Sequence, residues 1–163
     1  MKYFITSFIT FFSVCQVFAQ SQHIELKNDE ITIPLHTEFV LGVKNEGGKL
    51  SDFKILKEKQ IKETIDLMSV LKNTGKKEKP QTVSNEIEFK FANAEMMTSK
   101  FIILTTVQHL KETISFKAKI RIKGSHQYME TSIVHKAPNV FSVEQWQDDI
   151  DSIILYDFKI DHQ

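Results

Sequence analysis

The segment TISFKAKIRIK, residues 113–123, decides the fold class of this chain. Every second residue in it is apolar, and these residues are Ile114, Phe116, Ala118, Ile120 and Ile122. Successive side chains of a β-strand point to opposite faces, so this alternation predicts a strand with one apolar face and one basic face. Gly124 and Ser125 form a turn signal after it, and residues 128–135 are predicted to return as the second strand of a hairpin.

The same alternation recurs through most of the remaining chain. It predicts further strands at 24–26, 31–35, 39–43, 85–91, 100–108, 141–143 and 152–160. Residues 100–108 are apolar on both faces, which is typical of a central strand that is covered on both sides. Beyond residue 19 the chain holds 17 Ile, 8 Val and 10 Thr but only 4 Ala. Because Cβ-branched residues favour sheets and Ala favours helices, the composition also predicts a mainly-β protein.

Residues 59–72 fit two different periods. Ile61, Ile65, Met68 and Leu71 recur at helical spacing. Alternate residues from 65 to 71 fit a strand as well, so the helix near 59–72 is the favoured interpretation and the strand is the alternative. The polar residues 72–80 that follow predict a solvated loop.

About eight to ten short strands separated by turn signals predict an antiparallel β-sandwich. An immunoglobulin-like topology is favoured, although the Cys…Trp…Cys spacing of antibody domains is missing. An up-and-down β-barrel is the alternative. The length of 163 residues, with 41% hydrophobic and 26% charged, suits one domain with its own core.

The first nineteen residues have the pattern of a secretory signal peptide. Lys2 precedes an apolar run of about fifteen residues, which is short for a spanning helix. Val17 and Ala19 then occupy the small-residue positions of a cleavage site before Gln20. The pattern predicts cleavage of residues 1–19 and export to the periplasm or the exterior, with an uncleaved anchor as the alternative. Abundant Lys, Ile and Phe favour a bacterial origin.

The predicted mature chain, residues 20–163, is expected to form a single β-sandwich domain without cysteine. The one cysteine, Cys15, lies in the signal segment, so disulfides, thiolate metal sites and a cysteine nucleophile are not expected. Nucleotide-binding and nucleophile-elbow motifs are missing from the sequence, and the six histidines lack the close spacing of a zinc site. We therefore predict no cofactor and no catalytic residues.

A row of four cations is the most distinctive functional feature of the sequence. This basic row consists of Lys117, Lys119, Arg121 and Lys123 on one face of the predicted strand. It could dock an anionic partner, such as a protein or an acidic envelope polymer; the alternative is an ordinary solvent face. Nucleic acid is not predicted, because Arg121 is the only arginine and bidentate recognition of base edges and phosphates usually uses arginine.

The C-terminal segment 144–163 has the opposite charge, with six acidic residues against one lysine. Opposite charge predicts that it lies beside the basic row and neutralises part of it. Within this segment, Asp148, Asp149 and Asp151 could begin a calcium shell, although the glycine and spacing of an EF-hand are missing. A polar turn before the next strand is the simpler interpretation.

Trp146 is the only tryptophan in the chain. With Tyr128 or Tyr156 it could form an aromatic platform for a sugar ring or for a protein partner. The alternative is that it anchors the core of the sandwich.

Together these features predict an exported, non-catalytic binding module whose partner is contacted by the basic row and by Trp146. One alternative is a small-molecule carrier, which needs a cavity inside a barrel. Another is a hydrolase of envelope polymers, which needs a cleft with a strongly perturbed acid or histidine.

Overall fold

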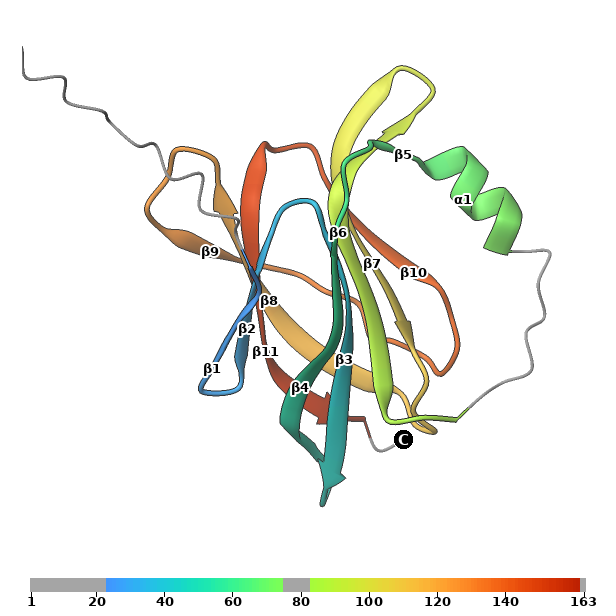
Figure 1. The fold of residues 1–163 in the computed structure, drawn as a ribbon, viewed down its shortest axis with the longest axis vertical. Helices are drawn as coiled ribbons and strands as arrows, with labels where there is room; N and C mark the ends of the chain where they lie inside the picture. The colour runs from blue at the N-terminus through green and yellow to red at the C-terminus, as the bar shows by residue number, and fades with distance from the viewer. Residues whose placement is uncertain (1–22, 75–82, 162–163) are drawn as a thin grey trace, which may run out of the picture.

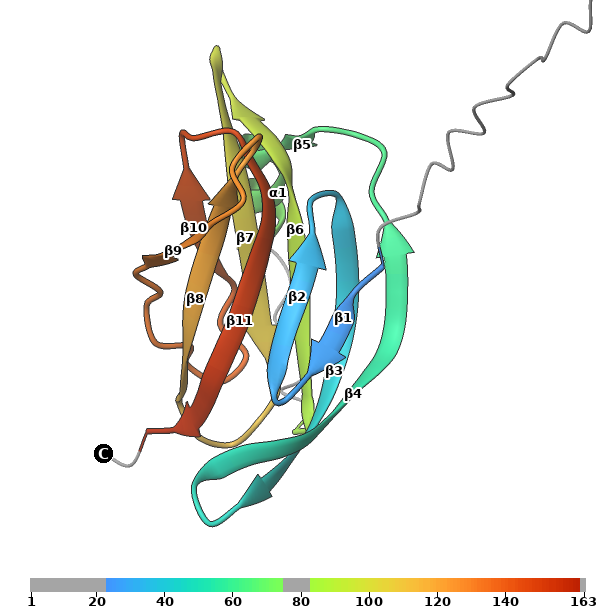
Figure 2. The same ribbon diagram turned by 90° about the vertical axis from the view of Figure 1, so that its left-hand side faces the viewer.

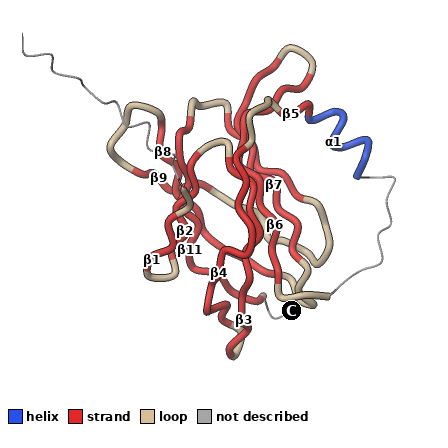
Figure 3. The backbone as a smooth tube through the Cα atoms, viewed as in Figure 1, coloured by secondary structure: helices blue, strands red, loops and turns tan. Residues whose placement is uncertain are grey.

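The computed structural model describes residues 23–74 and 83–161. The predicted signal peptide, Cys15 and most of the predicted loop at 72–80 lie outside these residues. Most of the described chain is strand, with one short helix at the side (Figures 1 and 3). The elements are β1 (Glu25–Lys27), β2 (Glu30–Pro34), β3 (Thr37–Glu46), β4 (Lys49–Gln60), β5 (Ile65–Asp66), α1 (Leu67–Thr74), β6 (Glu86–Met96), β7 (Ser99–Gln108), β8 (Ile114–Ile122), β9 (Tyr128–Thr131), β10 (Ser142–Trp146) and β11 (Ile150–Ile160).

The strands pair into one open sheet that folds back on itself as two layers. The β8 layer has the order β1-β2-β11-β8-β9, and the β6 layer has the order β4-β3-β6-β7-β10 (Figure 2). They meet at one corner, where Lys159 of β11 pairs with Lys49 of β4. Strand pairs are antiparallel except for the short pairing of β5 with β6. The predicted antiparallel sandwich with one helix is confirmed. The strand order does not confirm the immunoglobulin-like topology, and the open sheet differs from the alternative barrel.

Five phenylalanine rings fill the space between the two layers. Phe39 stacks on Phe89 with 5.0 Å between ring centroids, and Phe89 meets the edge of Phe116 at 5.7 Å. Phe116 then stacks on Phe158 at 4.9 Å, and Phe158 contacts Phe53 at 5.1 Å. These rings come from both layers, and all of them are buried. Each such aromatic pair adds about 0.5–1.5 kcal/mol beyond the burial of its apolar area.

The long strand β4 was not predicted, because its inward residues do not follow period two. Two register shifts each place an extra residue in β4 opposite β3. One lies near Asp52, whose φ of 50° is left-handed, and the other lies at Leu56. As a result the buried residues Leu50 and Phe53 are three positions apart. A β-bulge of this kind hides a strand from any search for strict alternation.

The helix predicted at 59–72 is correct in kind but shorter and later than expected. Residues 59 and 60 end β4, and Ile65–Asp66 pairs with β6 before α1 begins. The helix starts there because the Asp66 carboxylate accepts backbone N–H bonds from Met68 and Ser69, at 3.0 and 3.4 Å. The hydrogen bond from the Ser69 hydroxyl, and after it these backbone bonds, lower the pKa of Asp66. Leu67 then covers a second apolar cluster on the outer face of the β6 layer.

A buried polar cluster closes the side of the sandwich between β8 and β10. The Lys136 ammonium, whose side chain is 1% exposed, forms an ion pair with Glu144 of β10 and lies 5.8 Å from the Phe116 ring centroid. Beside it the buried Gln108 side chain donates to the carbonyl of Lys136 at 3.1 Å. Its oxygen accepts the N–H of Leu110 at 2.7 Å. This cluster attaches the segment between β9 and β10 to the core.

We expect Lys136→Met to lower the free energy of unfolding by about 3–5 kcal/mol, because it leaves the Glu144 carboxylate buried without its counter-charge. Replacing both partners, with Lys136→Met and Glu144→Leu, should recover most of this loss. The matched control is Lys123→Met, which removes an exposed pair with Asp149 and should cost less than about 1 kcal/mol. Urea denaturation measures all three, and equal losses for the two single variants would contradict the buried pair.

Candidate functional site

The basic row lies on the outer face of the β8 layer, where β11 brings carboxylates beside it. Three of its four cations form ion pairs with residues of the C-terminal segment. The pairs are Lys117–Asp157 at 3.1 Å, Arg121–Asp151 at 2.7 Å and Lys123–Asp149 at 3.5 Å. The prediction that the acidic segment lies beside the basic row is therefore confirmed. We call this surface the ion-pair face.

Aromatic side chains complete the ion-pair face. The Lys119 ammonium lies 4.4 Å from the centroid of the Tyr156 ring, and the Tyr156 hydroxyl donates to Glu130 at 2.7 Å. Hydrogen bonds to Lys159 and then Lys117 lower the pKa of Asp157, and the hydrogen bond to Asp151 raises the pKa of Arg121. The positive charge of the basic row is thus largely compensated within its own surface. An anionic partner would have to compete with these carboxylates.

Trp146 does not join the ion-pair face. It ends β10 and packs, partly buried, against the main core. Its indole N–H donates to the Thr131 hydroxyl at 2.9 Å. Because Thr131 is paired with the buried Ala118, it faces the interior side of the β8 layer. Trp146 therefore connects the two layers, and the structure does not bring it together with Tyr156 as a platform.

The three aspartates considered for calcium are used separately. Asp149 and Asp151 pair with Lys123 and Arg121, while Asp148 lines a shallow hollow beside β10. Within residues 23–74 and 83–161, no three His, Cys, Asp or Glu side chains come together as a metal site requires. The geometry gives the calcium interpretation no support.

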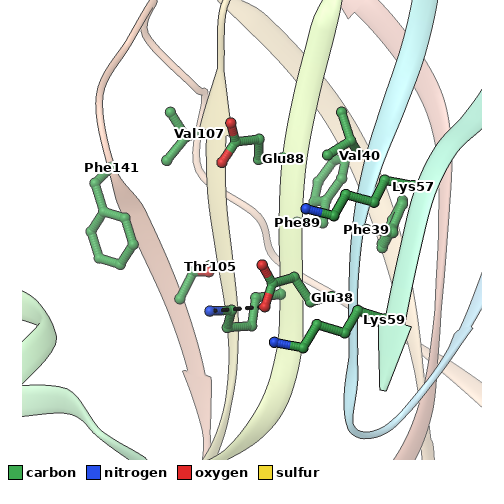
Figure 4. A pocket seen from close by; sticks show the side chains of 11 residues that line it. Glu38, Phe39, Val40, Lys57, Lys59, Glu88, Phe89, Thr105, Val107 and Phe141 are labelled. Carbon is green, nitrogen blue, oxygen red and sulfur yellow. Dashed lines mark ion pairs between the residues drawn. The ribbon is translucent and has the colours of Figure 1, made fainter. Parts of the chain in front are cut away.

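A hollow of about 300 Å³ lies on the outer face of the β6 layer (Figure 4). Lys57 and Lys59 of β4 form its basic wall. Val107 of β7 and Phe141, just before β10, form its apolar wall on the opposite side. Val40 lies between the two walls. The sequence did not predict this hollow, because β4 was not recognised and five separate segments contribute to it.

Charged groups on the floor of the hollow are paired, whereas those of its basic wall are not. Glu38 of β3 and Lys90 of β6 are register partners, and their charged atoms lie 3.2 Å apart. In the part of the chain that the structure describes, no carboxylate lies within 4.0 Å of the Lys57 or Lys59 ammonium. Both lysines are exposed. Their charge is available to a partner, in contrast to the basic row.

His109 fixes the position of the apolar wall. Its Nδ1 lies 2.9 Å from the Asn139 side-chain oxygen, and its Nε2 lies 3.2 Å from the Glu88 carboxylate. These contacts tie the segment that carries Phe141 to β6. Asn139, at a left-handed φ of 56°, also donates its N–H to the carbonyl of Gln108 at 2.7 Å. The wall is therefore held in place before any partner arrives.

The geometry offers little chemistry. His109 is hydrogen-bonded to a carboxylate and an amide, and not to a Ser, Thr or Cys side chain that it could activate as a nucleophile. Among the described residues, Asp52, Asp66 and Asp157 have a lowered pKa, caused chiefly by hydrogen bonds to Lys44, Ser69 and Lys159 respectively. Lowered values are typical of structural pairing, whereas a general acid needs a raised pKa.

No family model matches the chain, and no curated protein or solved structure matches it either. The described residues include no helix long and apolar enough to cross a membrane.

We expect Tyr156 to titrate well above the ordinary value of a tyrosine. The hydrogen bond to Glu130 raises the pKa of Tyr156 to about 12 from the ordinary 10.0, because the nearby carboxylate disfavours the tyrosinate. A raised folded-state pKa means that this bond stabilises the fold fully below pH 10.0 and that the stabilisation is lost as pH rises through about 12.

Tyrosinate absorbance measured against pH in the Tyr128→Phe background checks this value. Adding Glu130→Gln should move the Tyr156 midpoint back towards 10.0, because the charge is removed while the polar contact can persist. An unchanged midpoint in the Glu130→Gln variant would show that the carboxylate is not the cause. Circular dichroism over the same range separates titration from unfolding.

Proposed function

We propose that this chain is an exported, non-catalytic binding module that holds its partner in the hollow of the β6 layer. One observation carries the choice of surface: Lys57 and Lys59 face the hollow without an acidic partner among the described residues, whereas the basic row is compensated by Asp149, Asp151 and Asp157. A charge that is not neutralised internally attracts a partner more strongly. The export part of the proposal rests on the signal-like residues 1–19.

The hollow has the composition of a binding surface. It combines an apolar wall, a basic wall and a partly exposed ion pair between Glu38 and Lys90 within one concave region. Apolar contacts supply affinity there and the charged groups supply orientation. The carrier alternative lacks support because the five phenylalanine rings occupy the space between the layers. The hydrolase alternative lacks support because the carboxyl groups with a lowered pKa are held in structural hydrogen bonds.

A capture experiment from envelope extract tests the surface with matched variants. Val107→Trp fills the hollow with an indole and should reduce capture of the partner at least about tenfold. Thr32→Trp places the same side chain on the outer face of the β8 layer, where Thr32 is paired with Ile154, and should leave capture unchanged. Both positions are partly exposed on strands, so both variants should keep the fold.

The basic row is tested in the same experiment by changing Lys117, Lys119, Arg121 and Lys123 to Gln. Retained capture is expected, because the partner does not use these side chains. Capture lost in this variant but retained in Val107→Trp would assign binding to the ion-pair face and overturn the proposal. If the unmodified chain captures nothing at either low or high salt, the binding-module interpretation itself fails.

A further inference from the structure

We infer that the occupant of the hollow is an extended peptide in which acidic residues alternate with apolar residues. This inference rests on the proposed function and names the class of partner. The geometry points to it through three features: the width of the hollow, the spacing of its basic wall and the opposite character of its two walls.

The width of the hollow suits one extended chain. β4 and β7 are separated by β3 and β6, so the walls stand three strand spacings apart, about 14 Å. An extended chain with side chains on both sides occupies about 10 Å, which is the distance at which two sheets pack face to face. A single strand therefore fits lengthwise, with one row of side chains reaching each wall. A helix, which is about 10–12 Å in diameter, would fill the width but match the walls less well.

The spacing of the basic wall matches an extended chain. Lys57 and Lys59 are two residues apart in β4, so they repeat every 6.6–6.8 Å or so along the strand. Alternate side chains of an extended peptide repeat at the same distance, and acidic residues at alternate positions can therefore reach both lysines. On a helix, the residues that share a face are three and four positions apart. Their spacing therefore does not match the spacing of the two lysines.

The apolar wall determines which row of the peptide's side chains faces β4 and which faces β7. Val107 and Phe141 present hydrocarbon to the hollow, and Glu88 lies beside them, bonded to His109. A peptide carboxylate on this side would meet both an apolar surface and a like charge, which is unfavourable. Acidic side chains are thus directed to β4 and apolar side chains to β7. Between them, the Glu38–Lys90 pair offers an acceptor and a donor to the peptide backbone.

Fluorescence anisotropy with synthetic peptides and the purified chain tests the inference. The probe is a labelled peptide in which glutamate alternates with valine or threonine, and its control has the same composition with the glutamates grouped together. We expect the alternating peptide to bind at least about fivefold more tightly than the grouped one, and binding to weaken as salt rises.

Two double variants with the same charge change identify the site. Lys57→Gln with Lys59→Gln should weaken binding about five- to tenfold, because two exposed charge pairs are lost. Lys117→Gln with Lys119→Gln is the matched control: these lysines have the same spacing on β8 but already contact Asp157 and Tyr156. Binding to the control variant should be unchanged.

Equal affinity for the two peptides, or an affinity insensitive to Lys57 and Lys59, would overturn the inference. Binding of alginate that depends on these two lysines, without binding of the alternating peptide, would instead assign an acidic polysaccharide. If the peptide fails while Val107→Trp still abolishes capture of the natural partner, only the peptide class is wrong and the proposed function stands. If the peptide does not bind and Val107→Trp does not reduce capture of the natural partner, the proposed function is wrong as well.

Discussion

The packing of five phenylalanine rings between two β layers is the constraint on which the rest of the structure depends. Phe116 and Phe158 come from the β8 layer, and Phe39, Phe53 and Phe89 come from the β6 layer. Because these rings must face each other, period two directs the residues next to them outward wherever the alternation along a strand is unbroken. The identity of both outer surfaces follows from this single requirement.

The two outer surfaces differ because different strands are neighbours in each. In the β8 layer, β11 lies beside β8, and β11 together with Asp149 just before it supplies a carboxylate for three of the four cations of the basic row. In the β6 layer, β4 lies beside β3, and Lys57 and Lys59 face a hollow whose own acidic residues are engaged by Lys90 and His109. Lysines that look alike in the sequence therefore differ in the fold: those of the basic row are largely paired, whereas Lys57 and Lys59 can contact a partner.

Much of the architecture could be predicted from the sequence where alternation is unbroken, as in β8 and in residues 86–91 of β6. In β11 a register shift against β8 places Tyr156 on the outer face but Phe158 in the core. The prediction failed for β4, where two extra residues shift the pattern, and it misplaced the start of α1, which depends on the Asp66 cap and on pairing of β5 with β6. The candidate site was harder to predict from the sequence than the fold. The basic row was correctly placed on one face, but neither its compensation by β11 nor the contact of Trp146 with Thr131 follows from local pattern alone.

The sequence by itself determined the fold class, because the alternation of side chains along a strand is a local property that about ten residues can express. It also determined that Lys117, Lys119 and Arg121 would lie together on one face of β8, with Lys123 directly after the end of the strand. Only the tertiary structure decided which charges are neutralised and where a concave surface forms. Strand order brings Asp151 to Arg121 and Lys57 to the side of Val40. Such contacts join residues that are far apart in the chain, so the local periodicity of the sequence does not predict them.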